Sequence, residues 1–190
     1  MLVMHRIIGI HLVCLAFLHA TAGVAADERE ARTNDDMRYA SRISYMDRDL
    51  GPSFDTRSLL SYPPFVALAS EGNKNLEPCI KFLSQEGRNM NERMIALLSM
   101  HRLGVRDYTK FLRELTNLFD QGRVSADELG DAAIPSKVWS TVTIDNFKND
   151  EVRSVLSEIA RRRVGEGVKK SIQVILSGDA KLHRDAPCGC

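Results

Sequence analysis

The sequence predicts an all-α fold of antiparallel helical hairpins, and two observations lead to this prediction. Apolar residues recur at helical spacing in successive segments, and residues that start or stop helices bound each segment. Helices joined by loops of only a few residues must run antiparallel. The clearest apolar stripe consists of Tyr108, Phe111, Leu112, Leu115, Leu118 and Phe119, in a helix that Asp107 is expected to cap and Gly122 to end.

Residues 77–104 form the most distinct predicted hairpin, and Gly104 is expected to close its second helix. Pro78 is expected in the first turn of the first helix, where its missing N–H costs no hydrogen bond, and Gly87 is expected to end that helix. Asn89 or Asn91 is expected to cap the second helix, because an asparagine side chain accepts a hydrogen bond from a first-turn N–H.

Shorter helices are expected on both sides of this hairpin. Pro64 fits the start of a helix that stops near Gly72. Ser125 and Glu128 have the spacing of a capping box, in which each side chain accepts a hydrogen bond from the other residue's backbone N–H. The capping box predicts a further short helix that ends by Pro135.

Two helices are predicted to complete the C-terminal part, one capped by Asn149 and one running from about Gly167 to Gly178. Residues 138–147 before them are ambiguous. Residues 141–144 have strand propensity, yet the apolar residues of the segment can share one helical face. We favour a helix, because a lone strand in a helical chain has no partner.

Two blocks of the chain repeat one pattern, in which an asparagine-containing turn leads into a glutamate and an early arginine of a helix. The pattern residues are Pro78, Asn91, Glu92 and Arg93 in one block, and Asn149, Asp150, Glu151 and Arg153 in the other. The apolar and glycine positions that align without gaps are Met94, Ile95, Leu98, Leu103 and Gly104 with Val155, Leu156, Ile159, Val164 and Gly165. The pattern resembles degenerate HEAT-like helical repeats over about residues 62–165. This resemblance implies hairpins stacked as a short bundle or solenoid.

Residues 1–26 have the pattern of a signal peptide. Arg6 provides a basic start, residues 7–18 are mostly apolar, and Val24 and Ala26 stand where a signal peptidase reads small residues. The apolar run is shorter than the roughly 20 residues that a membrane-spanning helix needs. The sequence therefore predicts a periplasmic or secreted protein without an integral membrane segment after cleavage.

Composition divides the rest of the chain into three parts. Residues 27–61 are charged and poor in clustered apolar residues, which predicts a flexible or loosely ordered lead-in, although residues 37–47 could form a short helix against the domain. Residues 62–178 are the predicted helical-repeat domain. Residues 179–190 form a tail that ends in Cys-x-Cys.

The charge balance argues against two classes of partner. Cleavage after Ala26 would remove Arg6 and no acidic residue, so the 26 basic residues would fall to 25 and equal the 25 acidic residues. A balanced chain has no obvious basic face for nucleic acid. It also has no polybasic cluster for anionic lipid.

Three cysteines would remain after cleavage, namely Cys79, Cys188 and Cys190. In an oxidising compartment an odd number indicates one disulfide beside a free thiol, or an intermolecular bridge. The simplest pairing joins the C-terminal tail to the helix that carries Cys79. A bond between Cys188 and Cys190 is also possible, but it would close a strained ring.

The sequence contains no recognisable catalytic or cofactor pattern, and we expect no enzyme activity. His101 is expected as a surface or capping residue near a helix end. A nucleophilic pair of Cys79 and His101 is conceivable across the hairpin, but a bridged Cys79 would exclude it. The candidate ligands for a soft metal are His183, Cys188, Cys190, Met90, Met94 and Met100. Methionines at helical spacing are more often core residues, and no metal site is predicted.

These observations favour an exported helical protein that binds another protein as a scaffold or adaptor, with no chemistry of its own. A periplasmic immunity or inhibitor protein would be a special case of such binding. The alternative is a thiol or soft-metal-binding protein that acts through Cys188 and Cys190. No small-molecule substrate is evident from the sequence.

Overall fold

The computed structural model describes residues 29–52, 54–134 and 145–178. The predicted signal peptide and the Cys-x-Cys tail lie outside the described residues. The chain divides into two compact units, Met1–Arg38 and Tyr39–Cys190. In the first unit residues 29–38 are helical, and the side chain of Met37 is 57% exposed.

The second unit is helical wherever it has regular structure among the described residues, so the predicted all-α class is confirmed. Residues 39–50 are helical. The helices that follow are α2 (Thr56–Ser61), α3 (Pro63–Ser70), α4 (Gly72–Ser84), α5 (Met90–Ser99), α6 (Val105–Asp120), α7 (Ala126–Ala133), α9 (Asp150–Ala160) and α10 (Glu166–Ser177). Of the ambiguous segment 138–147, residues 138–144 lie outside the description, residues 145 and 146 are helical, and Phe147 is buried.

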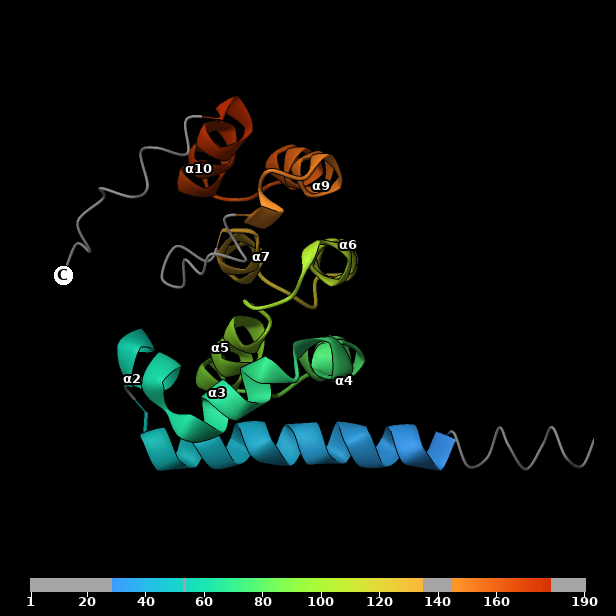
Figure 1. The fold of residues 1–190 in the computed structure, drawn as a ribbon, viewed down its shortest axis with the longest axis vertical. Coiled ribbons are helices and arrows are strands. Elements are labelled where there is room, and N and C mark those ends of the chain that lie inside the picture. The colour runs from blue at the N-terminus through green and yellow to red at the C-terminus, as the bar shows by residue number, and fades with distance from the viewer. Residues whose placement is uncertain (1–28, 53, 135–144, 179–190) are drawn as a thin grey trace, which may run out of the picture. The chain divides into compact units, whose positions relative to one another are not determined.

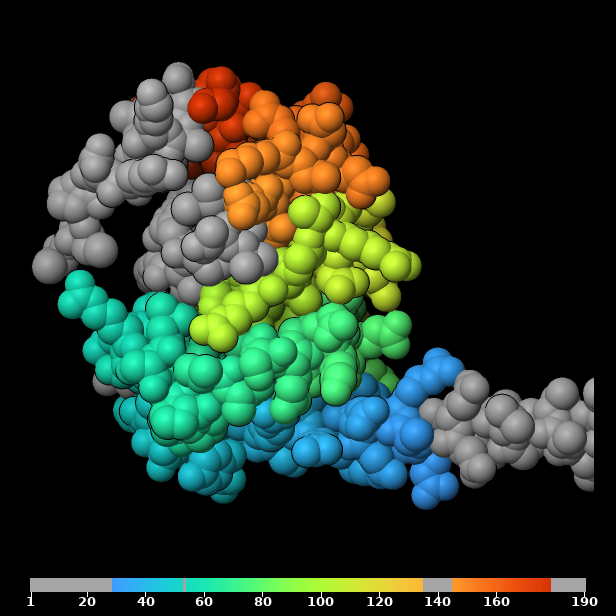
Figure 2. Space-filling model, viewed as in Figure 1, coloured from blue at the N-terminus to red at the C-terminus, as the bar shows by residue number. Residues whose placement is uncertain are grey.

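Consecutive helices of this unit pack as hairpins. Helix α4 packs against α5, α6 against α7, and α9 against α10. Between the hairpins, α6 contacts both α4 and α9, while α5 contacts both α3 and α7 (Figure 1). In the space-filling view the yellow-green α6 lies between the green α4 and the orange α9 (Figure 2). The helices thus form a bundle of neighbouring hairpins, as predicted, whereas their membership of a HEAT-like repeat class stays a prediction.

Most predicted helix ends are confirmed by their hydrogen bonds. The side chain of Asn89 caps α5 and that of Asn149 caps α9, each accepting a first-turn N–H at 2.9 Å. At α7 the Ser125 N–H donates to the Glu128 carboxylate at 2.7 Å, and the Glu128 N–H donates to the Ser125 hydroxyl oxygen at 3.2 Å. These two hydrogen bonds form the predicted capping box. Gly87 follows α4 with φ of 79°, a conformation that only glycine adopts without strain.

Helix α4 begins earlier than predicted, at Gly72, so that Pro78 lies inside the helix rather than in its first turn. Two contacts explain the early start. The buried Asn75 side chain donates to the Leu68 carbonyl at 3.1 Å, which joins α4 to α3. At Gly72 a Cβ atom would lie 3.2 Å from a methyl group of Leu103, so the absence of a side chain allows close packing.

Helix α6 also begins before its predicted cap. Gly104, expected to close the preceding helix, is the N-cap of α6, and Asp107 lies in the first turn instead. A carboxylate in the first turn still interacts favourably with the helix dipole.

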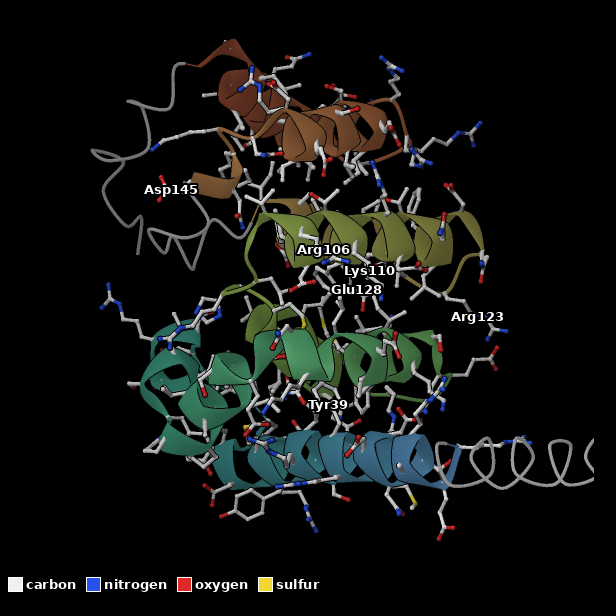
Figure 3. All side chains as sticks on the ribbon, turned by 45° about the vertical axis from the view of Figure 1, so that its right-hand side comes forward. Tyr39, Arg106, Lys110, Arg123, Glu128 and Asp145 are labelled. Atoms are coloured by element: carbon white, nitrogen blue, oxygen red, sulfur yellow. The ribbon has the colours of Figure 1, made fainter. Side chains whose placement is uncertain are left out.

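The packed core extends upstream of the predicted domain start at residue 62. Tyr39, Ile43 and Met46 share one face of helical residues 39–50 and are 2%, 0% and 1% exposed. The Tyr39 ring packs edge-on against Phe82 of α4, with ring centroids 6.0 Å apart (Figure 3). Charged residues lie between the residues of this apolar face in the sequence. The overall composition of residues 27–61 therefore predicted a loosely ordered segment, although one face of its helix is buried.

Candidate binding groove

A groove of about 300 Å³ lies between α5 and α7. Helix α5 supplies its apolar surface, which consists of Met90, Met94, Leu97 and Leu98. The opposite side and the ends are polar and consist of Arg88, Arg93, Ser125, Asp127, Glu128 and Asp131. We refer to this feature as the α5–α7 groove.

The apolar surface of the groove is accessible at one end and closed at the other. Met90 is 77% exposed, whereas Leu97 and Leu98 are each only 7% exposed. Met94 lies between them along the helix and is partly buried. Methionine side chains are flexible and polarisable, and they adapt to differently shaped apolar partners. Met90 continues into the apolar lining formed by Met94, Leu97 and Leu98, and a contiguous apolar surface of this kind is typical of a binding site.

Arg93 fixes the distance between the elements that form the groove. Its Nη1 donates to the Leu83 carbonyl near the end of α4, and its Nη2 donates to the Arg123 carbonyl before α7, both at 2.9 Å. Its Nε donates to the carboxylate of Glu128 on α7. One guanidinium thus joins α5 to α4, to the turn before α7 and to α7 itself. Figure 3 shows Glu128 between neighbouring helices and Arg123 at the outer edge.

Glu128 is held in its ionised form by these contacts. Partial burial alone would raise the pKa of its carboxyl group, but hydrogen bonds from Arg93 and from Ser125 outweigh this effect and lower the pKa. The Arg93 and Glu128 side chains are only 12% and 21% exposed. The pair is therefore shielded from solvent more than a typical surface ion pair, and it forms a rigid base for the groove.

The rim of the groove also carries two acidic residues. On α7, Asp127 and Asp131 occupy exposed positions that are one helical turn apart. Arg88 lies in the loop between α4 and α5, where its guanidinium is 4.3 Å from the centre of the Phe82 ring of α4 and donates to Gln85 at 2.6 Å. Arg88 pairs with Glu92 and Arg93 pairs with Glu128, so the exposed carboxylate of Asp127 gives the groove mouth a negative side.

Cys79, the one disulfide candidate within the described residues, is a free thiol in the core. It is 0% exposed, and its Sγ donates to the Ala96 carbonyl at 3.5 Å. Burial raises the pKa of the thiol to about 12, so it is a poor nucleophile at neutral pH. Cys188 and Cys190 lie outside the described residues, and the pairing of the three cysteines stays a prediction.

His101 does not lie on the surface; it is 9% exposed. Its ring stacks on Phe65 with centroids 6.1 Å apart, and its Nδ1 hydrogen-bonds to the Leu98 carbonyl at 2.6 Å. The second contact adds a side-chain hydrogen bond to a carbonyl at the end of α5 that also accepts from the Met100 and His101 N–H groups, so the predicted capping role is present. Burial lowers the pKa of the imidazole and so favours its neutral form.

The candidate soft-metal ligands that the structure describes, Met90, Met94 and Met100, do not share one surface. Met90 and Met94 line the groove, whereas Met100 is 1% exposed and belongs to the core. His183 and the two terminal cysteines fall outside the described residues. Where the structure is described, no group of three or more histidine, cysteine or acidic side chains could hold a metal ion.

Sequence reasoning did not identify the acidic side of the groove. Asp127 lies inside the predicted capping box and Asp131 in the short helix predicted after it, and their spacing of one turn was the available signal. This spacing predicts that both side chains lie on one helical face. It does not predict which neighbouring helix lies beside that face. The methionines of α5 were recognised, but as metal ligands or core residues.

Comparison of the chain with protein-family models, with curated proteins and with solved structures finds no match. Within the described part of the chain no helix is both long enough and apolar enough to cross a bilayer. The class that the fold and groove define is therefore an all-α helical bundle with an apolar groove and an acidic rim.

Proposed function

We propose that this protein is exported and binds another protein without chemistry of its own, and that it does so through the α5–α7 groove. The signal-peptide pattern of residues 1–26 supports export. The observation that supports binding most strongly is Met90, a large apolar side chain that is 77% exposed at the mouth of an apolar groove.

The occupant that fits this groove best is a basic amphipathic helix of the partner. Apolar side chains on one face of such a helix would contact Met90, Met94 and the leucines behind them. Lysine or arginine beside those apolar residues would meet Asp127 on α7. A volume of about 300 Å³ is at the low end of the range for small-molecule pockets, roughly 300–1,000 Å³, and suits a few inserted side chains.

A defined peptide pair tests this proposal. The first peptide contains leucine and lysine at helical spacing, and the second has glutamate in place of every lysine. Titration of the dye-labelled peptides with the protein, followed by fluorescence anisotropy, should show saturable binding of the first and at least about tenfold weaker binding of the second. Equal affinity for both peptides, or no binding of either, would contradict the proposal.

Matched variants locate the binding surface. Met90→Asp places a charge in the groove and should weaken binding of the leucine–lysine peptide at least about tenfold. Met37→Asp is the control, because Met37 is also exposed, at 57%, but does not line the groove. Asp127→Lys should weaken binding through repulsion without changing the apolar surface. Equal losses in the Met37 and Met90 variants would place the binding site elsewhere.

A further inference from the structure

The methionines of the second unit differ sharply in their access to solvent. Met90 is 77% exposed, whereas Met46 and Met100 are each 1% exposed. Met94 is partly buried beside Met90. The most accessible thioether among them therefore lies in the groove, where a change in polarity has the largest effect on an apolar ligand.

We propose that Met90 is a site of reversible oxidation by peroxides, and that its conversion to the sulfoxide weakens ligand binding in the α5–α7 groove. The second half of this inference rests on the proposed binding function. The first half depends only on the exposure of the thioether. Susceptibility of a thioether to peroxide depends on access, and the core packing around Met46 and Met100 excludes the oxidant.

The reaction needs hydrogen peroxide or an organic hydroperoxide and no catalyst. The sulfur lone pair of Met90 attacks one peroxide oxygen, an S–O bond forms and the O–O bond breaks. With hydrogen peroxide, the second oxygen leaves as water after proton transfer. The sulfur is oxidised by two electrons and the peroxide is reduced by two. A methionine sulfoxide reductase reverses the change by oxidising two thiols to a disulfide and releasing water.

The product changes the groove in a specific way. The sulfoxide is a polar hydrogen-bond acceptor, whereas the thioether is apolar and flexible. Met90 is the first residue of α5, and its side chain lines the groove mouth beside Met94. An apolar partner side chain would have to displace water from the sulfoxide without offering a hydrogen bond in return. Because Met90 lies outside the core, the bundle itself should tolerate the oxygen atom.

The first test needs no ligand. The full-length protein is treated with hydrogen peroxide for increasing times, digested and analysed by tandem mass spectrometry. Met90 should be oxidised at least about tenfold faster than Met46 and Met100, which serve as internal controls. Oxidation of Met90 at the same rate as the two buried methionines would overturn the inference.

The second test measures the consequence. Binding of the leucine–lysine peptide should weaken at least about tenfold after oxidation and return after treatment with the reductase. The variant Met90→Leu keeps an apolar side chain without sulfur, so its binding should resist peroxide. Met37→Leu should remain as sensitive as the unmodified protein. Circular dichroism of the oxidised protein checks that the helices persist.

The outcomes distinguish the two proposals. Tight binding that is unchanged when Met90 is fully oxidised would overturn the regulatory inference and leave the binding function intact. Selective oxidation of Met90 without any peptide binding in either form would support the modification site, overturn the proposed function and remove the regulatory consequence. If peroxide weakens peptide binding equally in Met90→Leu and in the unmodified protein, another residue causes the effect, and the role of Met90 is overturned.

Discussion

Arg93 on α5 and Glu128 on α7 form an ion pair at the base of the α5–α7 groove, and the same guanidinium donates to the carbonyls of Leu83 and Arg123 at 2.9 Å each. The pair therefore does two things. It holds the two helices that form the groove at a fixed separation, and it satisfies backbone carbonyls at the end of α4 and in the turn before α7.

Replacement of Arg93 by methionine should destabilise the fold by about 2–4 kcal/mol, because two carbonyls lose this donor and the partly buried carboxylate of Glu128 loses its cationic partner and keeps only its hydrogen bond from Ser125. Urea denaturation measures the change. Arg123→Met is the matched control, since the Arg123–Glu86 pair is solvent-exposed, with side chains 44% and 84% accessible. That variant should lose less than about 1 kcal/mol. Similar losses in the two variants would contradict the structural role of Arg93.

The stability contributed by Glu128 should depend on pH. Its pKa is lowered in the folded protein, so its contribution is fully present above the unfolded pKa of about 4.3 and is lost as the pH falls through the folded value. Glu128→Gln should therefore be less stable than the unmodified protein at pH 7, and the difference should shrink below about pH 4. Denaturant midpoints of both proteins across this range measure it. A difference that does not change with pH would show that the ionised carboxylate is not responsible.

Gly130 on α7 is required for the close approach of Val168 on α10. A Cβ atom at Gly130 would lie 2.6 Å from a methyl group of Val168, closer than such contacts allow. Gly130→Ala should destabilise the protein by about 1–3 kcal/mol, because the β-branched valine cannot move freely. Thermal and urea unfolding measure the loss.

Two variants control this prediction. At Gly167, in the first turn of α10, a Cβ atom would meet no packed neighbour within 4 Å among the described residues. Gly167→Ala should be neutral or stabilise by up to about 1 kcal/mol, because alanine favours helix. Adding Val168→Ala to Gly130→Ala should recover part of the loss by removing the clashing methyl groups. An unchanged loss in the double variant would rule out this contact as the cause.

The thiol of Cys79 should not react in the folded protein. It is 0% exposed, and burial raises its pKa to about 12. A maleimide reagent should modify it only after unfolding. Labelling of Cys79 after unfolding without reductant would indicate a free thiol, as in the structure. Labelling only after both unfolding and reduction would instead indicate the disulfide to the tail that the cysteine count suggests.

The helix class and many helix ends were predictable from the sequence because those features depend on local chemistry. Asn89, Ser125 and Asn149 cap their helices through side-chain hydrogen bonds to nearby N–H groups. The helix ends that differ from the prediction depend on contacts between residues that are distant in sequence. The start of α4 depends on packing of Gly72 against Leu103, and the residues around neither position predict that contact.

The repeat pattern of the sequence placed Arg93 and Arg153 in equivalent positions, and the structure gives them related contacts. Each is the fourth residue of a helix capped by asparagine, and each donates to carbonyls near a helix end. The partners differ, however. Arg93 donates back to Leu83 of the preceding helix, whereas Arg153 donates forward to Ile175 of the following helix at 3.1 Å. Spacing can predict the position of such an arginine but not the helix end that it meets.

The groove was less predictable than the helices. Met90 and Met94 are visible in the sequence as part of an apolar stripe, and Asp127 and Asp131 as acids one turn apart. Whether a stripe is covered depends on which helices pack over it. Met100, further along the same chain segment, is buried, while Met90 is not. That difference depends on which elements pack over each position in the folded chain, which periodicity alone does not specify.

The most direct test of the central claim is a two-dimensional NMR titration of the isotopically labelled protein with the unlabelled leucine–lysine peptide. We predict that shift changes concentrate on residues 90–98 of α5 and 125–131 of α7, the segments that line the groove. Shift changes centred on the outer faces of α6 and α9, or none at saturating peptide, would contradict the claim that this groove is the binding site.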